Sequence, residues 1–332
     1  MSLSYKDSGV DIDRLSLIKK GIARKAKKTF SSAVLSEIGL FGSLFALKGY
    51  KNPVLVSSVD GVGTKILVAR MMKRHNTIGE CLVNHCVNDI LTLGAKPLFF
   101  LDYLAFSQVE DWIIEEIFSG LRRACQRNSL SLVGGEIAQL PGIYPEGVYD
   151  LVGFIVGVVE KGKEISGKGI KEGDLVIGLP SNGLHTNGYS LARKVLLEEK
   201  GFGLKDKPFP LKRNLGEELL RVHKSYLKEV SPYLPLVKGI AHITGGGFKE
   251  NIRRILPQGV SVVIEKRSWQ IPEIFRLIQD AGKIPDEEMY RVFNMGIGLV
   301  LFLSKENLKR IRIRGARVIG EVKKGDREVF IQ

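Results

Sequence analysis

The chain has 332 residues, of which 44% are hydrophobic and 26% charged, and its formal net charge is +14. This length exceeds that of one compact core of usual size, so we expect two domains of an ordinary globular protein. No run of about 18 apolar residues occurs, and the N-terminus MSLSYKDSGVDID lacks a secretory apolar stretch, so we expect a cytosolic protein with no membrane partner.

The positive charge is concentrated in two clusters, one on the polar face of a helix expected near the N-terminus and one close to the C-terminus. They comprise Lys19, Lys20, Arg24, Lys25, Lys27 and Lys28, and Arg310, Arg312, Arg314, Arg317, Lys323 and Lys324. A basic protein can bind nucleic acid, but neither cluster is interleaved with aromatic residues that would stack on bases. A solvated basic surface that attracts anionic substrates is the favoured interpretation, and we expect no nucleic-acid partner.

An apolar strand expected over residues 54–60 ends on Asp60 and passes directly into Gly61-Val62-Gly63-Thr64-Lys65. A carboxylate can hold Mg²⁺, backbone N–H groups can face phosphate oxygens, and the lysine adds a positive charge. The spacing is neither that of a P-loop nor that of a dinucleotide-binding turn. A plain glycine turn after a strand therefore stands as the alternative.

Helices and strands alternate along the whole chain. In the first half we expect helices at 65–75, 78–93 and 109–128, and strands at 98–106, 129–133 and 148–159. The segment 161–174, rich in glycine and charge, has little to bury and is a candidate linker. Beyond it we expect strands at 175–179, 260–264, 297–303 and 316–322, and helices at 189–200, 217–230 and 248–256. This pattern predicts a mixed α and β (α+β) fold, with one domain over 1–165 and another over 166–332.

Acidic residues of the first half stand beside glycine, beside asparagine or at a strand end. They are Asp60, Asp89, Asp102 and Glu136. Asp102 lies within the apolar run FFLDYLAF, where a buried carboxylate needs a partner or a metal. One such acid can be structural, whereas four together are typical of a shared Mg²⁺–phosphate site.

Two loops of the second half are rich in hydrogen-bond donors, and each precedes an expected helix. They are Ser181-Asn182-Gly183-Leu184-His185-Thr186-Asn187-Gly188 and Thr244-Gly245-Gly246-Gly247. Such loops bind anions, and the donors on both sides of His185 favour a role beyond that of a capping residue. No G-x-S-x-G elbow occurs, and the three cysteines, Cys81, Cys86 and Cys125, have packing rather than reactive settings. These features suit ATP-dependent activation of an oxygen by positioning and electrostatics.

Taken in order, the motifs resemble those of the AIR synthetase (phosphoribosylformylglycinamidine cyclo-ligase) family over almost the entire chain. They are SLSYKDSGVDID (2–13), DGVGTK (60–65), VND (87–89), GAKPLFFLDYLA (94–105), LVGGE (132–136), HTNGYSL (185–191), HITGGGFKENI (242–252) and MYRVFNMGIG (289–298). The resemblance implies two domains, each a mostly antiparallel or mixed sheet covered by helices. It implies ATP-dependent cyclisation of formylglycinamidine ribonucleotide to 5-aminoimidazole ribonucleotide, in a homodimer whose N-terminal domains pair and bind the nucleotide.

The resemblance also implies roles for individual residues. Asp60, Asp89 and Glu136 would hold Mg²⁺ and the ATP phosphates, and Asp60, Lys65, Asp89 and His185 would be the catalytic residues. Lys6, Gly61, Gly63, Thr64, Lys65 and Asp102 would complete the ATP site. The substrate would be received by Ser181, Gly183, His185, Thr186, Asn187, Gly188, Thr244, Gly245, Gly246 and Gly247. ATP and Mg²⁺ are the implied cofactors, with K⁺ as a further candidate.

Three positions depart from the family's usual pattern. Val59 and Ile137 stand where threonine is usual, and Gln139 stands where glutamate is usual. An amide cannot neutralise a cation, so we assign no metal-ligand role to Gln139. The alternatives are another ATP-dependent enzyme of the superfamily, such as a formylglycinamidine ribonucleotide synthetase or a thiamine-monophosphate kinase, and a basic nucleic-acid-binding module. Selenophosphate synthetase is disfavoured because no cysteine precedes Cys81.

Overall fold

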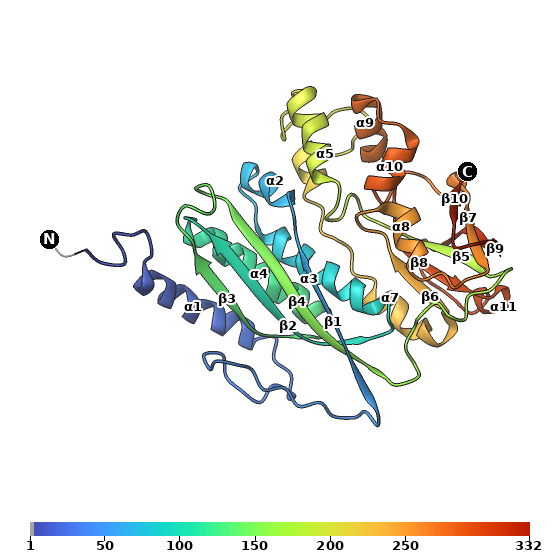
Figure 1. The fold of residues 1–332 in the computed structure, drawn as a ribbon. Helices are drawn as coiled ribbons and strands as arrows, with labels where there is room; N and C mark the ends of the chain where they lie inside the picture. Colours follow the sequence, from blue (N-terminus) through green and yellow to red (C-terminus); the bar gives the residue numbers. More distant parts are fainter. Residues whose placement is uncertain (1–2) are drawn as a thin grey trace. The chain divides into compact units, whose positions relative to one another are not determined.

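The computed structural model describes residues 3–332, so Ser2 of the N-terminal motif lies outside it (Figure 1). The chain forms two compact units. The N-terminal unit comprises the residues up to Ile90 together with Lys96–Lys161, and the C-terminal unit comprises Leu91–Ala95 and Gly162–Gln332. The observed boundary after Lys161 lies at the start of the candidate linker. That Leu91–Ala95 belongs to the C-terminal unit was not predicted from the sequence.

The N-terminal unit contains a four-stranded mixed sheet with the strand order β1-β4-β2-β3. Its strands are β1 (Pro53–Gly61), β2 (Lys96–Phe106), β3 (Ser131–Gln139) and β4 (Tyr149–Glu160). The pairs β1–β4 and β2–β4 are antiparallel, whereas β2 and β3 run parallel. All four strands were predicted, although β3 continues six residues beyond the predicted end at Val133.

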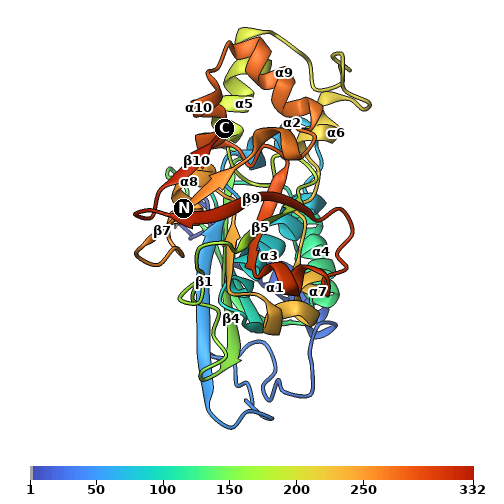
Figure 2. The ribbon, with the colours of Figure 1, turned by 90° about the vertical axis from the view of Figure 1, so that its right-hand side faces the viewer.

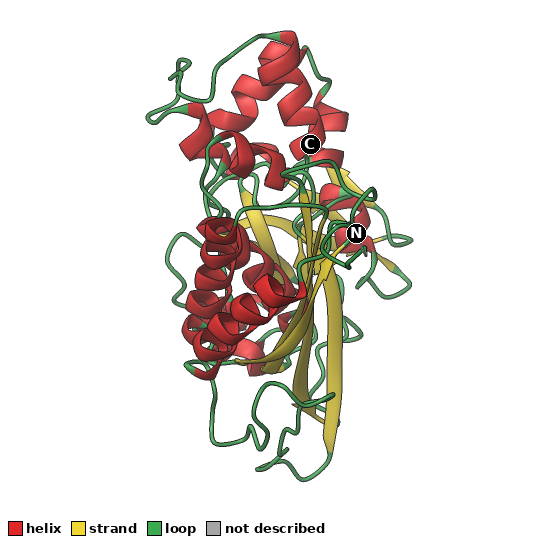
Figure 3. Ribbon diagram, turned by 90° about the vertical axis from the view of Figure 1, so that its left-hand side faces the viewer, coloured by secondary structure: helices red, strands yellow, loops and turns green. Residues whose placement is uncertain are grey.

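Helices cover one face of this sheet (Figure 3). They are α1 (Ile12–Lys27), α2 (Lys65–Met71), α3 (Asn76–Leu91) and α4 (Asp111–Arg127). The helices α3 and α4 approach so closely that a Cβ on Gly79 would overlap the carbonyl oxygen of Ile117, and one on Gly120 would overlap that of Asn76. Glycine at both positions therefore permits this backbone contact.

The C-terminal unit contains a six-stranded sheet with the order β10-β7-β9-β5-β8-β6, parts of which can be followed in Figure 2. Its strands are β5 (Leu175–Pro180), β6 (Gly239–His242), β7 (Val260–Ile264), β8 (Ile297–Leu303), β9 (Arg317–Lys324) and β10 (Val329–Ile331). Only β10 and β7 pair in parallel among the described strands of this sheet. Every residue of β8 is buried, as its continuous apolar sequence predicts.

Short helices complete the C-terminal unit. They are α5 (Tyr189–Arg193), which continues as the π-helical turn η1 (Lys194–Glu199), α6 (Leu215–Leu219), α7 (Leu227–Val230), the 3₁₀ turn η2 (Ser231–Leu236), α8 (Gly247–Arg253), the 3₁₀ turn η3 (Lys266–Ser268), α9 (Glu273–Gly282), α10 (Asp286–Val292) and α11 (Lys305–Leu308). Within residues 3–332, no helix combines the length and the apolar character needed to cross a bilayer.

The prediction of a continuous helix over residues 217–230 is wrong. The chain leaves the helical conformation after Leu219 and resumes it only at Leu227. Between these points His223 and Tyr226 are fully buried, and the Tyr226 hydroxyl donates a hydrogen bond to the Pro180 carbonyl. Tertiary contacts of these two side chains replace the helical conformation that the local pattern favours.

Candidate active site

Two acids of the N-terminal unit gather around one buried histidine. Asp60 lies at the end of β1, and His85 and Asp89 lie one turn apart on α3. The Nε2 atom of His85 is 2.9 Å from Asp60 Oδ2 and 3.7 Å from Asp89 Oδ2. The Ser58 hydroxyl donates to Asp89 Oδ2 at 3.2 Å. The strand end and the helix together therefore present two carboxylates and a hydroxyl, the oxygen donors that Mg²⁺ prefers.

The electrostatics of this cluster centre on His85. Burial lowers the pKa of this imidazole, but the hydrogen bond to Asp60 and the charges of Asp89 and Asp60 outweigh it and raise the pKa above its ordinary value. The imidazole of His85 thus lies within reach of both carboxylates. Beside it the Gly61 N–H donates to Asp60 Oδ1 at 2.7 Å, and Gly63 has a left-handed φ of 64° that ends the turn.

The two lysines predicted at the nucleotide differ in setting. Lys65 begins α2, and its side chain is fully buried with the ammonium group donating to Cys81 Sγ at 3.2 Å. Burial lowers the pKa of this ammonium. Lys6 is exposed and forms an ion pair with Asp11 at 2.9 Å. Of the two, Lys6 is therefore the one exposed to solvent.

Asp102 occupies the middle of β2. It lies in the same row of cross-strand neighbours as Asp60. The row runs across the sheet through Asp60, Gly153, Asp102 and Gly135. Because β4 separates β1 from β2, the backbones of Asp60 and Asp102 are about 10 Å apart along the row. The Asp102 side chain is buried, its Oδ2 atom has no hydrogen-bond partner among the described residues, and burial raises its pKa to about 8.

Glu136 does not join the Asp60–Asp89 cluster. It lies on β3, beyond β4 and β2 from β1, where its exposed side chain forms an ion pair with Lys19 at 3.5 Å. Glu136 and Asp102 instead line one cavity of about 750 Å³, bounded by α1, residues 38–43, β2 and β3. The structure thus brings Asp60 together with Asp89, and brings Asp102 and Glu136 to a separate cavity.

In the C-terminal unit, Asn294 holds the loop that contains Ser181 and Gly183. Its Oδ1 atom accepts from the Ser181 hydroxyl and from the Gly296 N–H, and its Nδ2 donates to the Gly183 carbonyl, all at 2.9 Å. The loop contains Gly183 and Gly188 with positive φ, and a Cβ on Gly188 would overlap the Phe293 ring. His185 itself adopts a left-handed φ of 64°, a conformation that is uncommon for residues other than glycine.

Three histidines meet beside this loop. The rings of His185 and His223 stack with centroids 4.0 Å apart, and His223 Nε2 is 3.0 Å from His242 Nε2. The Thr186 hydroxyl is 3.2 Å from His223 Nδ1. All three histidines are buried. Two of the predicted substrate residues, His185 and Thr186, are therefore parts of a larger polar cluster.

The glycine loop before α8 is held by Asn251. The Nδ2 atom of this residue donates to the carbonyl of Gly247 at 2.7 Å and to that of Gly245 at 3.2 Å. A Cβ built on Gly245 would lie 3.3 Å from Asn187 Oδ1, so the predicted substrate loops 181–188 and 244–247 are adjacent. Both loops thus lie in one region of the C-terminal unit.

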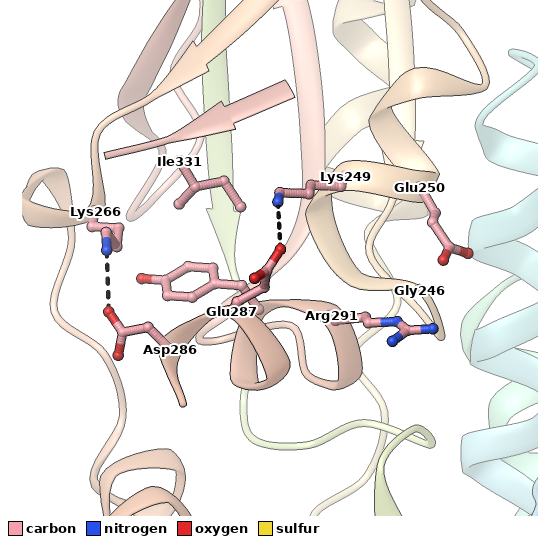
Figure 4. Close-up of a pocket in the computed structure, with 9 residues that line it drawn as sticks. Gly246, Lys249, Glu250, Lys266, Asp286, Glu287, Arg291 and Ile331 are labelled. Atoms are coloured by element: carbon pink, nitrogen blue, oxygen red, sulfur yellow. Dashed lines mark hydrogen bonds and ion pairs between the residues drawn. The ribbon is translucent and has the colours of Figure 1, made fainter. Parts of the chain in front are cut away.

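A cavity of about 490 Å³ opens beside Gly246. It is lined by Gly246, Lys249, Glu250, Lys266, Asp286, Glu287, Tyr290, Arg291 and Ile331 (Figure 4). Lys249 pairs with Glu287 at 3.0 Å and Lys266 with Asp286 at 3.1 Å, and Arg291 also lines the cavity. Its mixed charges suit a polar ligand rather than an apolar one.

Several side chains that shape these sites were assigned no role from the sequence. They are His85, His223, His242, Asn251 and Asn294. His242, Asn251 and Asn294 lie inside the family motifs HITGGGFKENI and MYRVFNMGIG, so the motifs themselves carried a signal. His223 lies in the segment that was wrongly predicted as helix, which concealed it.

Both units match known protein families. Residues 45–159 match AIR synthase related protein, N-terminal domain, and residues 171–332 match AIR synthase related protein, C-terminal domain. Among solved structures, thiamine-monophosphate kinase from Stenotrophomonas maltophilia superposes with a TM-score of 0.68 at 16% identity, covering 93% of this chain and 94% of the kinase. The hydrogenase maturation protein HypE in complex with ATP gives 0.64 at 14% identity, covering 92% and 88%. The fold is therefore that of the AIR synthase related proteins.

Relatives of high sequence identity show to which of these protein families the chain belongs. Phosphoribosylformylglycinamidine cyclo-ligase from Thermoanaerobacter pseudethanolicus is 48% identical, covering 99% of this chain and 100% of the relative. The cyclo-ligase from Caldanaerobacter subterraneus is 49% identical with the same coverage, and that from Bacillus pumilus is 47% identical, covering 99% and 98%. The chain belongs to the phosphoribosylformylglycinamidine cyclo-ligase (AIR synthetase) family.

Proposed function

We propose that the protein uses ATP to close the imidazole ring of formylglycinamidine ribonucleotide in purine biosynthesis, giving 5-aminoimidazole ribonucleotide, ADP and phosphate. ATP phosphorylates the formamide oxygen, a nitrogen of the amidine then attacks the activated carbon, and phosphate leaves. The full-length identity of 48–49% to cyclo-ligases carries this proposal. The shortage of reactive nucleophiles agrees with it, since Cys81, Cys86 and Cys125 are buried.

The N-terminal unit would bind the metal and the nucleotide phosphates. Asp60 and Asp89 would hold Mg²⁺, because their carboxylates already meet at one point and are hard oxygen ligands. The ion would neutralise charge that develops on the transferred phosphoryl group. Gly61, Gly63 and Thr64 would face the phosphates, Lys6 would cover the nucleotide, and Asp102 with Glu136 would contact ATP from their separate cavity.

The C-terminal unit would bind the ribonucleotide substrate. The adjacent loops 181–188 and 244–247 supply hydroxyl, amide and backbone donors, and the cavity beside Gly246 adds three cationic and three acidic side chains. Donors at fixed positions orient a phosphate-bearing substrate and stabilise charge that forms during ring closure.

One assay tests the reaction. Purified protein would be incubated with ATP, formylglycinamidine ribonucleotide and Mg²⁺, with and without K⁺, while ADP is measured enzymatically and the aminoimidazole product by diazo coupling. We expect ADP and product in equal amounts only when the ribonucleotide is present. ADP formation that is independent of the ribonucleotide, or none at all, would contradict the proposal. Thiamine monophosphate as the acceptor provides the test of the kinase alternative.

We further propose a cytosolic homodimer in which the N-terminal units pair. The sheet face opposite the helices exposes Val59 and Phe154, which are cross-strand partners, together with Leu55 and Tyr103. Exposed apolar patches of this kind mark protein–protein contacts. Val59→Glu would place a charge in the patch, and light scattering should show a shift from dimer to monomer. Val318→Glu, at an exposed position of the C-terminal unit, should leave the wild-type mass unchanged.

A further inference from the structure

The three buried histidines of the C-terminal unit form an ordered hydrogen-bonded chain. The Thr186 hydroxyl lies 3.2 Å from His223 Nδ1, and His223 Nε2 lies 3.0 Å from His242 Nε2. Both ring nitrogens of His223 are thus engaged, one toward the loop 181–188 and one toward the end of β6. His185 stacks on the same ring, with the two planes inclined by 21°.

A neutral imidazole has one N–H donor and one acceptor nitrogen, so it donates one of its two hydrogen bonds and accepts the other. If Thr186 donates to His223 Nδ1, then His223 Nε2 donates to His242 Nε2, and His242 carries its own proton on Nδ1. If Thr186 accepts instead, His242 carries its proton on Nε2. The orientation of one hydroxyl and the tautomer of a histidine on another segment are therefore linked through His223.

The same cluster could be considered as a metal site, because one ring nitrogen from each histidine lies within 4.8 Å of the others. The geometry argues against an ion. Two nitrogens bound to one tetrahedral zinc at 2.0–2.1 Å are separated by about 3.3 Å, whereas the observed 3.0 Å is a hydrogen-bond distance. The nearly parallel rings of His185 and His223 cannot both direct an in-plane lone pair at one ion.

We propose that His223 is a positioning residue, which fixes the tautomer of His242 and supports the stacked ring of His185. Ring closure requires that the attacking nitrogen lose a proton as the C–N bond forms and the C–O bond to phosphate breaks. A histidine with a fixed tautomer presents either an acceptor or a donor nitrogen at a defined place, which such a transfer requires. This role rests on the proposed placement of the substrate at loop 181–188.

The chain contains only five histidines, so ring nitrogens can be assigned by NMR of protein labelled with ¹⁵N-histidine. Thr186→Val removes the hydroxyl and keeps the side-chain shape. We expect it to shift the ring-nitrogen resonances of both His223 and His242, although it is His223 Nδ1 that lies within hydrogen-bond distance of the hydroxyl. Thr186→Ser should retain the wild-type pattern. Unchanged His242 resonances in Thr186→Val would overturn the coupling.

Kinetics test whether the enzyme uses this coupling. His223→Gln can bond to one neighbour but cannot transmit a tautomer, so kcat/KM for the ribonucleotide should fall about 10–100-fold while KM for ATP is retained. Circular dichroism confirms the fold of the variant. His75→Gln is the matched control, since His75 is also buried and bonded, to Tyr149, but lies in the other unit. Wild-type kcat/KM in His223→Gln would overturn the positioning role.

Two further results separate this proposal from its competitors. Elemental analysis of the purified protein should find no stoichiometric transition metal. One equivalent of metal in the wild type that is absent from His223→Ala would show that the three histidines form a metal site and would overturn the proposal. Wild-type protein that fails to form aminoimidazole would contradict the proposed function. The NMR test of the coupling between Thr186 and His242 does not require enzymatic activity, so its result is independent of the proposed function.

Discussion

Asp60 of β1 and His85 of α3 form a hydrogen bond, in which a carboxylate oxygen lies 2.9 Å from a buried imidazole nitrogen. The strand end supplies the carboxylate and the helix supplies the histidine, so two separate elements build the cluster. Asp89, one helical turn after His85, reaches the same nitrogen at 3.7 Å. The position of α3 against the sheet therefore decides the spacing of the two proposed metal ligands.

Replacing Asp60 with asparagine should abolish turnover without unfolding the protein. The change removes one of two carboxylates proposed to hold Mg²⁺, so kcat/KM should fall at least about 100-fold. The side chain is 42% exposed at a strand end, so the midpoint of thermal unfolding should change little. ADP release and circular dichroism measure the two effects. An unfolded variant with normal activity in its folded fraction would favour a structural role.

Asp102→Asn should make the protein more stable at alkaline pH. Its folded-state pKa of about 8 lies above the ordinary value of 3.8, so the folded state keeps a proton that the unfolded state loses. The free energy of unfolding contributed by this group therefore falls as pH rises from about 4 to 8 and is then constant. Asparagine cannot ionise, so the variant does not lose this free energy of unfolding, which is on the order of a few kcal/mol.

Urea unfolding at pH 5 and pH 8.5 measures the Asp102 effect. The gain of Asp102→Asn over wild type should be clearly larger at the higher pH. Asp326→Asn changes an exposed aspartate and should show no such difference. A gain that is equal at both values would mean that Asp102 ionises normally in the folded protein.

Asn294→Ala should loosen the loop 181–183 and weaken substrate use. Three hydrogen bonds would be lost, and the buried partners would be left unsatisfied, at a cost of at least about 2 kcal/mol in the free energy of unfolding. KM for the ribonucleotide should rise while KM for ATP stays constant. Asn307→Ala removes a single hydrogen bond, to Leu236, and serves as the control. Equal losses in both variants would show that Asn294 has no special role.

Gly79→Ala should destabilise the N-terminal unit. A single methyl group would be forced against the backbone of α4, which cannot move as a flexible side chain can. Overpacking of this kind costs about 1–3 kcal/mol, and contact with backbone places this case at the upper end. Gly42→Ala meets no atom within 4 Å and should be neutral. Chemical unfolding of the two variants compares them directly, and similar midpoints would mean that the helices readily separate.

The sequence predicted the elements whose patterns are local. Asp60 near a strand end and the strand over 297–303 are confirmed, because strand periodicity and residue type determine them. The three cysteines that were predicted to pack are all buried. The mixed fold is confirmed as well. The helix over 217–230 was wrong, since burial of His223 and Tyr226 depends on residues far away in sequence.

The sequence could not show which acids meet. Asp60 and Glu136 both follow predicted strands, yet two intervening strands separate β3, which carries Glu136, from β1, which carries Asp60. Strand order arises from long-range pairing, which no local pattern encodes. The family motifs gave residue types at the sites, while the bonds of His85, His223 and Asn294 appeared only in three dimensions. The ligand roles themselves stay predictions.

Because Leu91–Ala95 belongs to the C-terminal unit while both of its flanks belong to the N-terminal unit, no single cut separates the two units. The Leu93 carbonyl accepts a hydrogen bond from Ile165, and a Cβ on Gly94 would lie 3.2 Å from the Ile165 side chain. A fragment ending at Lys161 would therefore carry a five-residue segment deprived of these contacts. Expression of the halves, domain exchange between homologues and circular permutation all need to treat this short segment as part of the C-terminal half.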